Sequence, residues 1–230
     1  MTTRLLLFDI DGTLVLTGGA GQRAIRRAFH ELFGVTDGFV GVPMAGRTDR
    51  YLVQDGLERC GLPATAETLA QVRERYLTLL AEEIHGPAQG TKAMMPGVAL
   101  LLDALATMGH VHSALLTGNY EVGARIKLEH FDLWRHFAWG AFGDDYTDRN
   151  LMAQAAVAAA PARGVTLADP AHAIVIGDTP FDIACARAAG ARVIAVATGG
   201  HDVGELRACG PDAVFEDLHD LDAVLAAIAD

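Results

Sequence analysis

The stretch Leu5-Leu6-Leu7-Phe8-Asp9-Ile10-Asp11-Gly12-Thr13 runs from an apolar segment straight into two aspartates. A segment that is apolar on both faces is typical of a strand in the middle of a parallel sheet covered by helices. Side chains alternate along a strand, so Asp9 and Asp11 can point the same way while Ile10 turns to the core. Gly12 permits a tight turn, and the main-chain amides after Asp9 can cradle a phosphate. The stretch predicts a central strand with a polar site at its carboxyl end.

The same pattern, an apolar run that stops at glycine or polar residues, recurs further along the chain. The runs are Val111–Leu116, Ala173–Ile176, Arg192–Ala197 and Ala213–Phe215, and the first three end at Thr117-Gly118-Asn119, Gly177-Asp178-Thr179 and Thr198-Gly199-Gly200. Helical patterns lie between them at Val98–Met108, Glu121–Phe131, Asn150–Ala160 and Phe181–Ala189. Alternating strands and helices predict an α/β fold with a Rossmann-like parallel sheet, in which ligands bind at the carboxyl ends of the strands.

One long segment interrupts this alternation. From Gly18 to Ala93 we find apolar stripes at helical spacing and no convincing strand. Glycines open the segment, and a Gly-Pro stretch closes it. We therefore expect a helical cap over residues 17–93, inserted into a catalytic core made of residues 1–16 and 94–230.

Composition narrows the class of protein. The 230 residues are 51% hydrophobic and 20% charged, with a formal charge of −11, as in a soluble globular protein. Net negative charge argues against nucleic acid or an anionic membrane as the main partner. We find neither a membrane span nor a secretory signal, and three scattered cysteines suggest a reducing compartment. We expect a cytoplasmic monomer or homodimer.

The polar strand ends bring carboxylates together. Asp9 and Asp11 end the first strand, Asp178 ends another, and Asp182 follows Asp178 by one helical turn. An all-oxygen cluster of this kind suits Mg²⁺. Thr117 ends a third strand and adds a hydroxyl.

These residues resemble the motifs of the haloacid-dehalogenase-like hydrolases, and more narrowly the phosphoglycolate-phosphatase-like branch, which carries a helical cap after the first strand. The first family motif, DxDGT, is Asp9 to Thr13. The second, an apolar strand ending in threonine, is Leu115 to Asn119, and the fourth is Gly177-Asp178 with Asp182. Motif order and cap position fit over essentially the whole chain.

The third family element is a cation that neutralises the phosphoryl group. The chain has two lysines, Lys92 and Lys127, and Lys127 lies on the helix that follows Thr117. In many relatives this lysine comes later, where the present chain reads Asp148-Arg149-Asn150. We select Lys127, with Arg149 as the alternative.

The resemblance implies an aspartyl-phosphate mechanism. Asp9 would be the nucleophile and Asp11 the acid and base, with Mg²⁺ held by Asp9, the main-chain carbonyl of Asp11, and Asp178. Thr117 and Lys127 would hold the phosphoryl oxygens, and Asp182 would orient Lys127 or a metal-bound water. We expect the remaining phosphate contacts from the loops of the first two motifs, at Gly12, Thr13, Gly118 and Asn119.

The cap is expected to select the leaving group. Its polar loop Gly46-Arg47-Thr48-Asp49 can face the site, and Arg47 suits a substrate carboxylate. Family analogy suggests a small phosphorylated metabolite such as 2-phosphoglycolate.

Two alternatives keep the same aspartates. A phosphosugar mutase of the β-phosphoglucomutase type has the same motifs, so the sequence leaves it open. A catalytically idle relative that works by binding is the alternative without enzyme activity. A dehalogenase is disfavoured because it has no use for Asp11, and a phosphonatase because Lys92 lies only at the edge of the cap.

Overall fold

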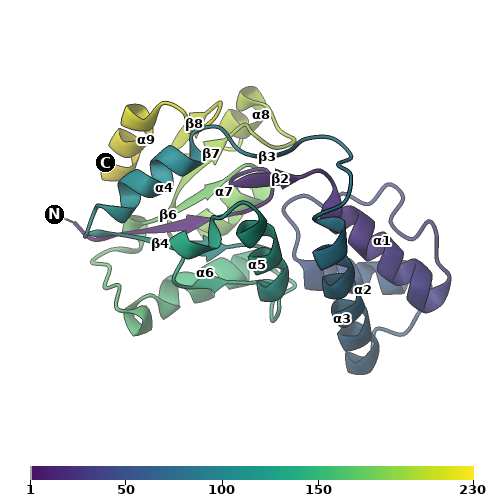
Figure 1. Ribbon diagram of the computed structural model, residues 1–230. Coiled ribbons are helices and arrows are strands. Elements are labelled where there is room, and N and C mark those ends of the chain that lie inside the picture. Colours follow the sequence, from purple (N-terminus) through teal and green to yellow (C-terminus); the bar gives the residue numbers. More distant parts are fainter. Residues whose placement is uncertain (1) are drawn as a thin grey trace.

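The computed structural model describes residues 2–230 and contains a six-stranded sheet in the order β5-β4-β1-β6-β7-β8 with every pairing parallel (Figure 1). The strands are β1 (Arg4–Phe8), β4 (Val111–Leu116), β5 (Gly140–Ala141), β6 (Ala173–Gly177), β7 (Arg192–Val196) and β8 (Ala213–Phe215). β1 is the third strand in this order and is flanked by β4 and β6, as its apolar sequence predicts. The predicted α/β fold with a parallel sheet is confirmed.

Helices cover both faces of the sheet. They are α4 (Val98–Ala106), α5 (Glu121–His130), α6 (Arg149–Ala159), α7 (Pro180–Ala188), α8 (Val203–Ala208) and α9 (Leu221–Ala229). Short 3-10 turns lie at Trp134–His136, Pro161–Arg163 and Pro170–His172. The four core helices expected from sequence end within two residues of their predicted bounds.

Alternation along β1 divides the core into two layers. Leu6 and Phe8 pack with the residues of α4, α5 and α9, whereas Leu5 and Leu7 pack with those of α6, α7 and α8. All four side chains are fully buried. A charged residue at any of these positions would lie inside one layer or the other, which is why the run is apolar throughout.

The inserted segment forms a separate helical layer beside the carboxyl end of β1 (Figure 1). It consists of α1 (Ala20–Phe33), α2 (Asp49–Arg59) and α3 (Ala66–Glu83), packed around Phe29, Phe39 and Leu80. Glu83 binds both Arg23 and Arg27 of α1, at 2.6 and 2.7 Å, and so ties α1 to α3.

Two short strands connect the cap to the core. β2 (Val15–Thr17) pairs antiparallel with β3 (Lys92–Met94), so the chain enters and leaves the cap side by side. The expectation that Gly18 to Ala93 contains no strand is therefore wrong at its last residues. A three-residue strand is too short to show a periodicity, and β3 forms because β2 offers it a partner.

Candidate active site

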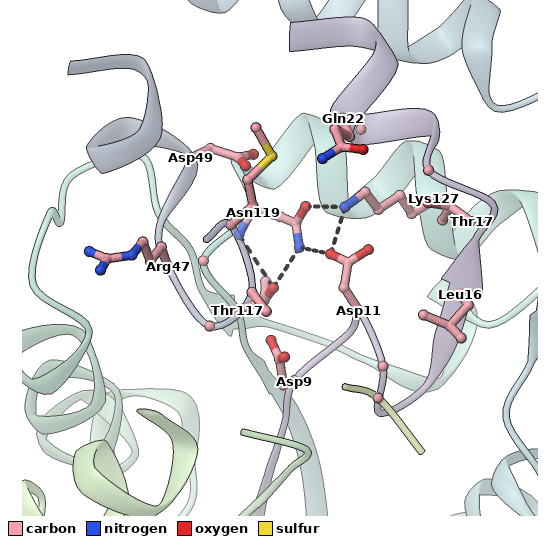
Figure 2. Close-up of a pocket in the computed structure, with 18 of the residues that line it drawn as sticks. Asp9, Asp11, Leu16, Thr17, Gln22, Arg47, Asp49, Thr117, Asn119 and Lys127 are labelled. Carbon is pink, nitrogen blue, oxygen red and sulfur yellow. Dashed lines mark hydrogen bonds and ion pairs between the residues drawn. The ribbon is translucent and has the colours of Figure 1, made fainter. Parts of the chain in front are cut away.

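A cavity of about 500 Å³ lies where the carboxyl ends of the core strands meet the cap. The core lines it with residues that follow β1, β4, β6 and β7 and with side chains of α5 and α6. The cap lines it with α1, α2, α3 and the loop before α2. Asp9, Asp11 and Thr117 project into this space, with the cap residues Gln22 and Asp49 opposite them (Figure 2). A cavity of this size suits a small organic ligand.

Three buried carboxylates converge below the cavity. Oxygen atoms of Asp9, Asp178 and Asp182 lie within 4.8 Å of one another. Burial and the neighbouring carboxylates raise the pKa of Asp178 well above its usual range, and burial raises that of Asp9 although Arg149 opposes the change. Such a cluster is unfavourable unless positive charge compensates it.

The surroundings of Asp178 fit a divalent cation. Its carboxylate accepts a hydrogen bond from Thr13 Oγ1 at 3.1 Å. Gly12, at φ 88°, and Gly199 press their backbones against the same carboxylate, where a Cβ on either would overlap its oxygens. With Asp9 beside it, this carboxylate offers the hard oxygen ligands that Mg²⁺ prefers.

Arg149, the first residue of α6, lies on this carboxylate cluster. Its guanidinium forms an ion pair with Asp182 and another with Asp9, Nη2 to Oδ1 3.1 Å. The side chain is buried, and Nε has no hydrogen-bond partner. Burial opposes the charged form, but Asp182 and Asp9 outweigh it and hold the pKa of Arg149 above its ordinary value. Arg149 is thus a fixed positive charge beside the candidate nucleophile.

Lys127, from α5, lies instead on Asp11. Its Nζ donates to Asp11 Oδ2 and to Asn119 Oδ1, both at 2.6 Å. Asn119 Nδ2 donates to the same Asp11 oxygen and to Thr117 Oγ1, both at 2.8 Å. These four side chains form one network at the cavity (Figure 2). The structure differs from the expectation that Asp182 orients Lys127. Asp182 binds Arg149 instead, and Lys127 binds Asp11.

Asp49 brings a carboxylate from the cap. Thr48 caps the N-terminus of α2 through Tyr51, and the Asp49 amide donates to Gly118 O at 2.7 Å. The Asp49 carboxylate accepts from Tyr120 N at 2.9 Å. Burial raises the pKa of Asp49 to about 6, although Lys127 lowers it. The loop of the cap therefore rests directly on the core loop that follows β4.

Arg47 faces away from the candidate nucleophile (Figure 2). Its guanidinium lies over the ring of Tyr51 at 4.6 Å and that of Phe181, on the core helix α7, at 5.6 Å. The expected contact with a substrate carboxylate finds no support in this arrangement. Instead, Arg47 bridges α2 and α7 through cation–π contacts.

Most of the residues selected from the sequence meet at the cavity. They are Asp9, Asp11, Gly12, Thr117, Gly118, Asn119, Lys127 and Asp178, together with Arg47. Thr13 and Asp182 are fully buried and support Asp178 and Arg149 rather than line the cavity. Asp49 also lines the cavity, and the sequence does not single it out within the loop Gly46-Arg47-Thr48-Asp49, because an acidic residue after a capping threonine is typical of an ordinary helix start.

Known proteins resemble the chain in sequence and in fold. Residues 149–221 match the HAD-hydrolase-like family. The chain is 27% identical to phosphoglycolate phosphatase from Salmonella typhi, over 95% of this chain and 90% of that protein. It is 28% identical to phosphoglycolate phosphatase from Agrobacterium fabrum, with coverage of 95% and 92%. The crystal structure of a predicted phosphoglycolate phosphatase from Haemophilus somnus superposes with a TM-score of 0.71 at 18% identity, covering 98% of this chain and 99% of that one.

These matches confirm the resemblance to the haloacid-dehalogenase-like hydrolase superfamily that the motifs predict. The relatives also support the predicted enzyme class, a hydrolase of the phosphatase type. Within residues 2–230, no helix has the length and apolar character needed to cross a membrane.

Proposed function

We propose that the protein is a Mg²⁺-dependent phosphatase that hydrolyses a small phosphomonoester through an aspartyl-phosphate intermediate. The observation that carries this proposal is the meeting of Asp9, Asp178 and Asp182 under a cavity that also holds Asp11 and Thr117. Nucleophile, acid and cation site are thus within reach of one phosphoryl group, which is what in-line phosphoryl transfer requires.

In the first step, a carboxylate oxygen of Asp9 attacks phosphorus, and the bond from phosphorus to the leaving oxygen breaks. Asp11 gives its proton to that oxygen, so the product leaves as an alcohol. Thr117, Gly12 and Gly118 line the cavity, and we place the phosphoryl oxygens against them. In the second step, water attacks phosphorus, its proton goes to Asp11, and inorganic phosphate and the Asp9 carboxylate are released.

Two cationic side chains assist these steps, Arg149 at Asp9 and Lys127 at Asp11. Arg149 offsets the charge on Asp9 as a dianionic phosphate approaches, while Lys127 and Asn119 hold Asp11 in place for proton transfer. We therefore assign the neutralising role beside the nucleophile to Arg149 and the positioning of the acid to Lys127. Mg²⁺ held by Asp9, the main-chain carbonyl of Asp11, and Asp178 would supply the further positive charge that this approach needs.

Phosphate release over a panel of esters tests the proposal. The panel contains 2-phosphoglycolate, which the relatives' names suggest, with sugar phosphates, nucleotides and p-nitrophenyl phosphate, each with and without Mg²⁺. We expect release that depends on Mg²⁺. Asp9→Asn should lower kcat at least about a thousandfold and leave the circular dichroism spectrum unchanged. Comparable activity in this variant would remove Asp9 as the nucleophile.

The same assay separates the alternatives. A folded protein that releases no phosphate from any ester is next incubated with a sugar monophosphate and its bisphosphate, where isomerisation would identify a mutase. Absence of both reactions would leave a relative that works by binding.

A further inference from the structure

The cap contributes a largely uncharged wall to the cavity. Its lining includes Gln22, Ile25, Met44, Leu52 and Tyr76. Among the described residues of this wall, Asp49 and Arg47 carry charge, and Arg47 is directed onto the rings of Tyr51 and Phe181. The charge that the cap presents to a bound leaving group is therefore the negative one of Asp49.

The other cations that line the cavity are already engaged. Lys127 is bound to Asp11 and Asn119, and Arg149 to Asp9 and Asp182. In the part of the chain that the structure describes, the remaining lining cation is Arg47, which has no ion-pair partner but is directed away from Asp9 and onto the rings of Tyr51 and Phe181 (Figure 2). The cations that face Asp9 and Asp11 are thus both occupied when a carboxylate on the leaving group arrives. Such a carboxylate would instead come to lie with Asp49 and Asp11 around it.

Asp49 can still accept further hydrogen bonds. An ionised carboxylate has about four acceptor sites, and Tyr120 N occupies one of them. The Tyr76 phenol interacts with the Asp49 carboxylate, and burial, with the charges of Asp49 and Asp11, raises the pKa of this phenol well above the usual range, so it stays protonated. A hydroxyl-bearing ligand would find acceptors in the remaining sites of the Asp49 carboxylate and in the Tyr76 oxygen.

We propose that Asp49 is a specificity-determining residue that selects a leaving group with hydroxyl groups and rejects one with a carboxylate. The substrate class is thus a phosphorylated polyol, sugar or similar neutral hydroxyl compound. This inference rests on the proposed phosphatase function and refines it. The cavity, at about 500 Å³, also has room for a leaving group larger than the two carbons of glycolate.

A matched pair of esters tests the selection. 2-Hydroxyethyl phosphate and 2-phosphoglycolate have the same carbon chain and differ in a terminal hydroxyl or carboxylate. We expect kcat/KM of the wild-type protein to favour the hydroxyl ester at least about tenfold, because like charges are brought together in the other complex. Glycerol 3-phosphate against 3-phosphoglycerate should show the same preference.

Asp49→Asn removes the charge and keeps a side chain of the same shape. We expect it to bring the kcat/KM ratio of the two esters within about threefold of unity, chiefly by lowering KM for 2-phosphoglycolate. Asp55→Asn is the matched control, since Asp55 lies on the same helix, pairs with Arg59 and does not line the cavity. Its ratio should equal that of the wild type.

The outcomes separate the two proposals. Preference of the wild type for 2-phosphoglycolate, or an unchanged ratio in Asp49→Asn, would overturn the inference while Mg²⁺-dependent release from p-nitrophenyl phosphate keeps the phosphatase. If p-nitrophenyl phosphate is also inert, both proposals fall. Should Asp49→Asn not fold, the wild-type ratio over both ester pairs decides by itself.

Discussion

At the scale of single residues, Arg149 at the start of α6 is the cation that holds two carboxylates of the site together. It joins the carboxylate of Asp9, which directly follows β1, to that of Asp182 on α7, and all three side chains are buried. Removing one member of a buried ion pair leaves the other charge uncompensated, which is far costlier than losing a pair at the surface. Arg149 should therefore contribute to folding as well as to chemistry.

Arg149→Met is expected to lower the free energy of unfolding by about 3–5 kcal/mol and to reduce kcat at least about a hundredfold. Urea unfolding and phosphate release measure the two effects. Arg187→Met is the control, because Arg187 pairs with Asp212 near the surface and its loss should cost at most about 1 kcal/mol. Equal losses in the two variants would show that burial of Arg149 has no special energetic role.

Asp49 gives a second prediction, which concerns pH. The pKa of its carboxyl is about 6 in the folded protein, and the usual value is 3.8, so the folded state binds more protons between these values. The contribution of Asp49 to the free energy of unfolding is therefore greatest at low pH. It falls by at most about 3 kcal/mol as the pH rises from about 4 to about 6.

Asp49→Asn lacks this titration, so the melting temperature of the variant relative to wild type should rise from pH 4 to pH 7 and then level off. Thermal melts at unit pH steps measure it, with Asp55→Asn run in parallel. A difference in melting temperature that does not vary with pH would contradict the prediction.

At the scale of elements, the loop before α2 is closely fitted to the core. A Cβ on Gly118 would overlap the main chain at Arg47, and one on Gly46 would overlap Phe181. Arg47 then spans the gap between α2 and α7. The cap is thus held against the core at this loop, and the ion pair of Arg73 on α3 with Asp144 forms a second contact between cap and core.

Phe181→Ala should weaken this contact by about 0.5–1 kcal/mol, which corresponds to a rise in KM of roughly two- to fivefold with little change in melting temperature. Phe181 is 44% exposed, so its loss leaves no internal cavity. Leu151→Ala removes a comparably exposed apolar side chain from α6, and its KM should equal that of the wild type. An unchanged KM in Phe181→Ala would mean that the ring does not help to hold the cap.

The elements that sequence analysis found are those with long or repeated patterns. The strand β1 is a continuous apolar run, and α1 and α3 carry apolar stripes at helical spacing, whereas β5 has two residues and forms by pairing with β4. For the site, DxDGT placed Asp9 and Asp11, but no local signal could say which carboxylate each cation would choose. The carboxylate that Lys127 binds, and those that Arg149 binds, depend on how α5 and α6 pack on the sheet. That packing in turn depends on contacts between distant segments of the chain.

At the scale of the whole molecule, the proposed metal site predicts that Mg²⁺ binding and stability are coupled. Asp9 and Asp178 have raised pKa values because burial and mutual repulsion oppose their charges. A cation that binds the folded state alone stabilises it by about 2.7 kcal/mol at a hundred times its Kd.

We expect millimolar Mg²⁺ to raise the melting temperature by several degrees at pH 8, and EDTA to reverse the effect. Asp178→Asn should abolish the shift, whereas Asp212→Asn, at an ion pair near the surface, should retain it. If Mg²⁺ leaves the melting temperature of the wild-type protein unchanged, the protein is better described as a relative that does not bind this metal.

The pairing of β2 with β3 has a consequence for how the gene can evolve. Because Thr17 and Lys92 are partners in one register, the two ends of the cap are neighbours, and the polypeptide enters and leaves the helical segment at a single place. A recombination event that exchanged everything between them would leave the sheet and its aspartates intact. The chemistry and the choice of substrate can therefore follow separate evolutionary histories within one gene.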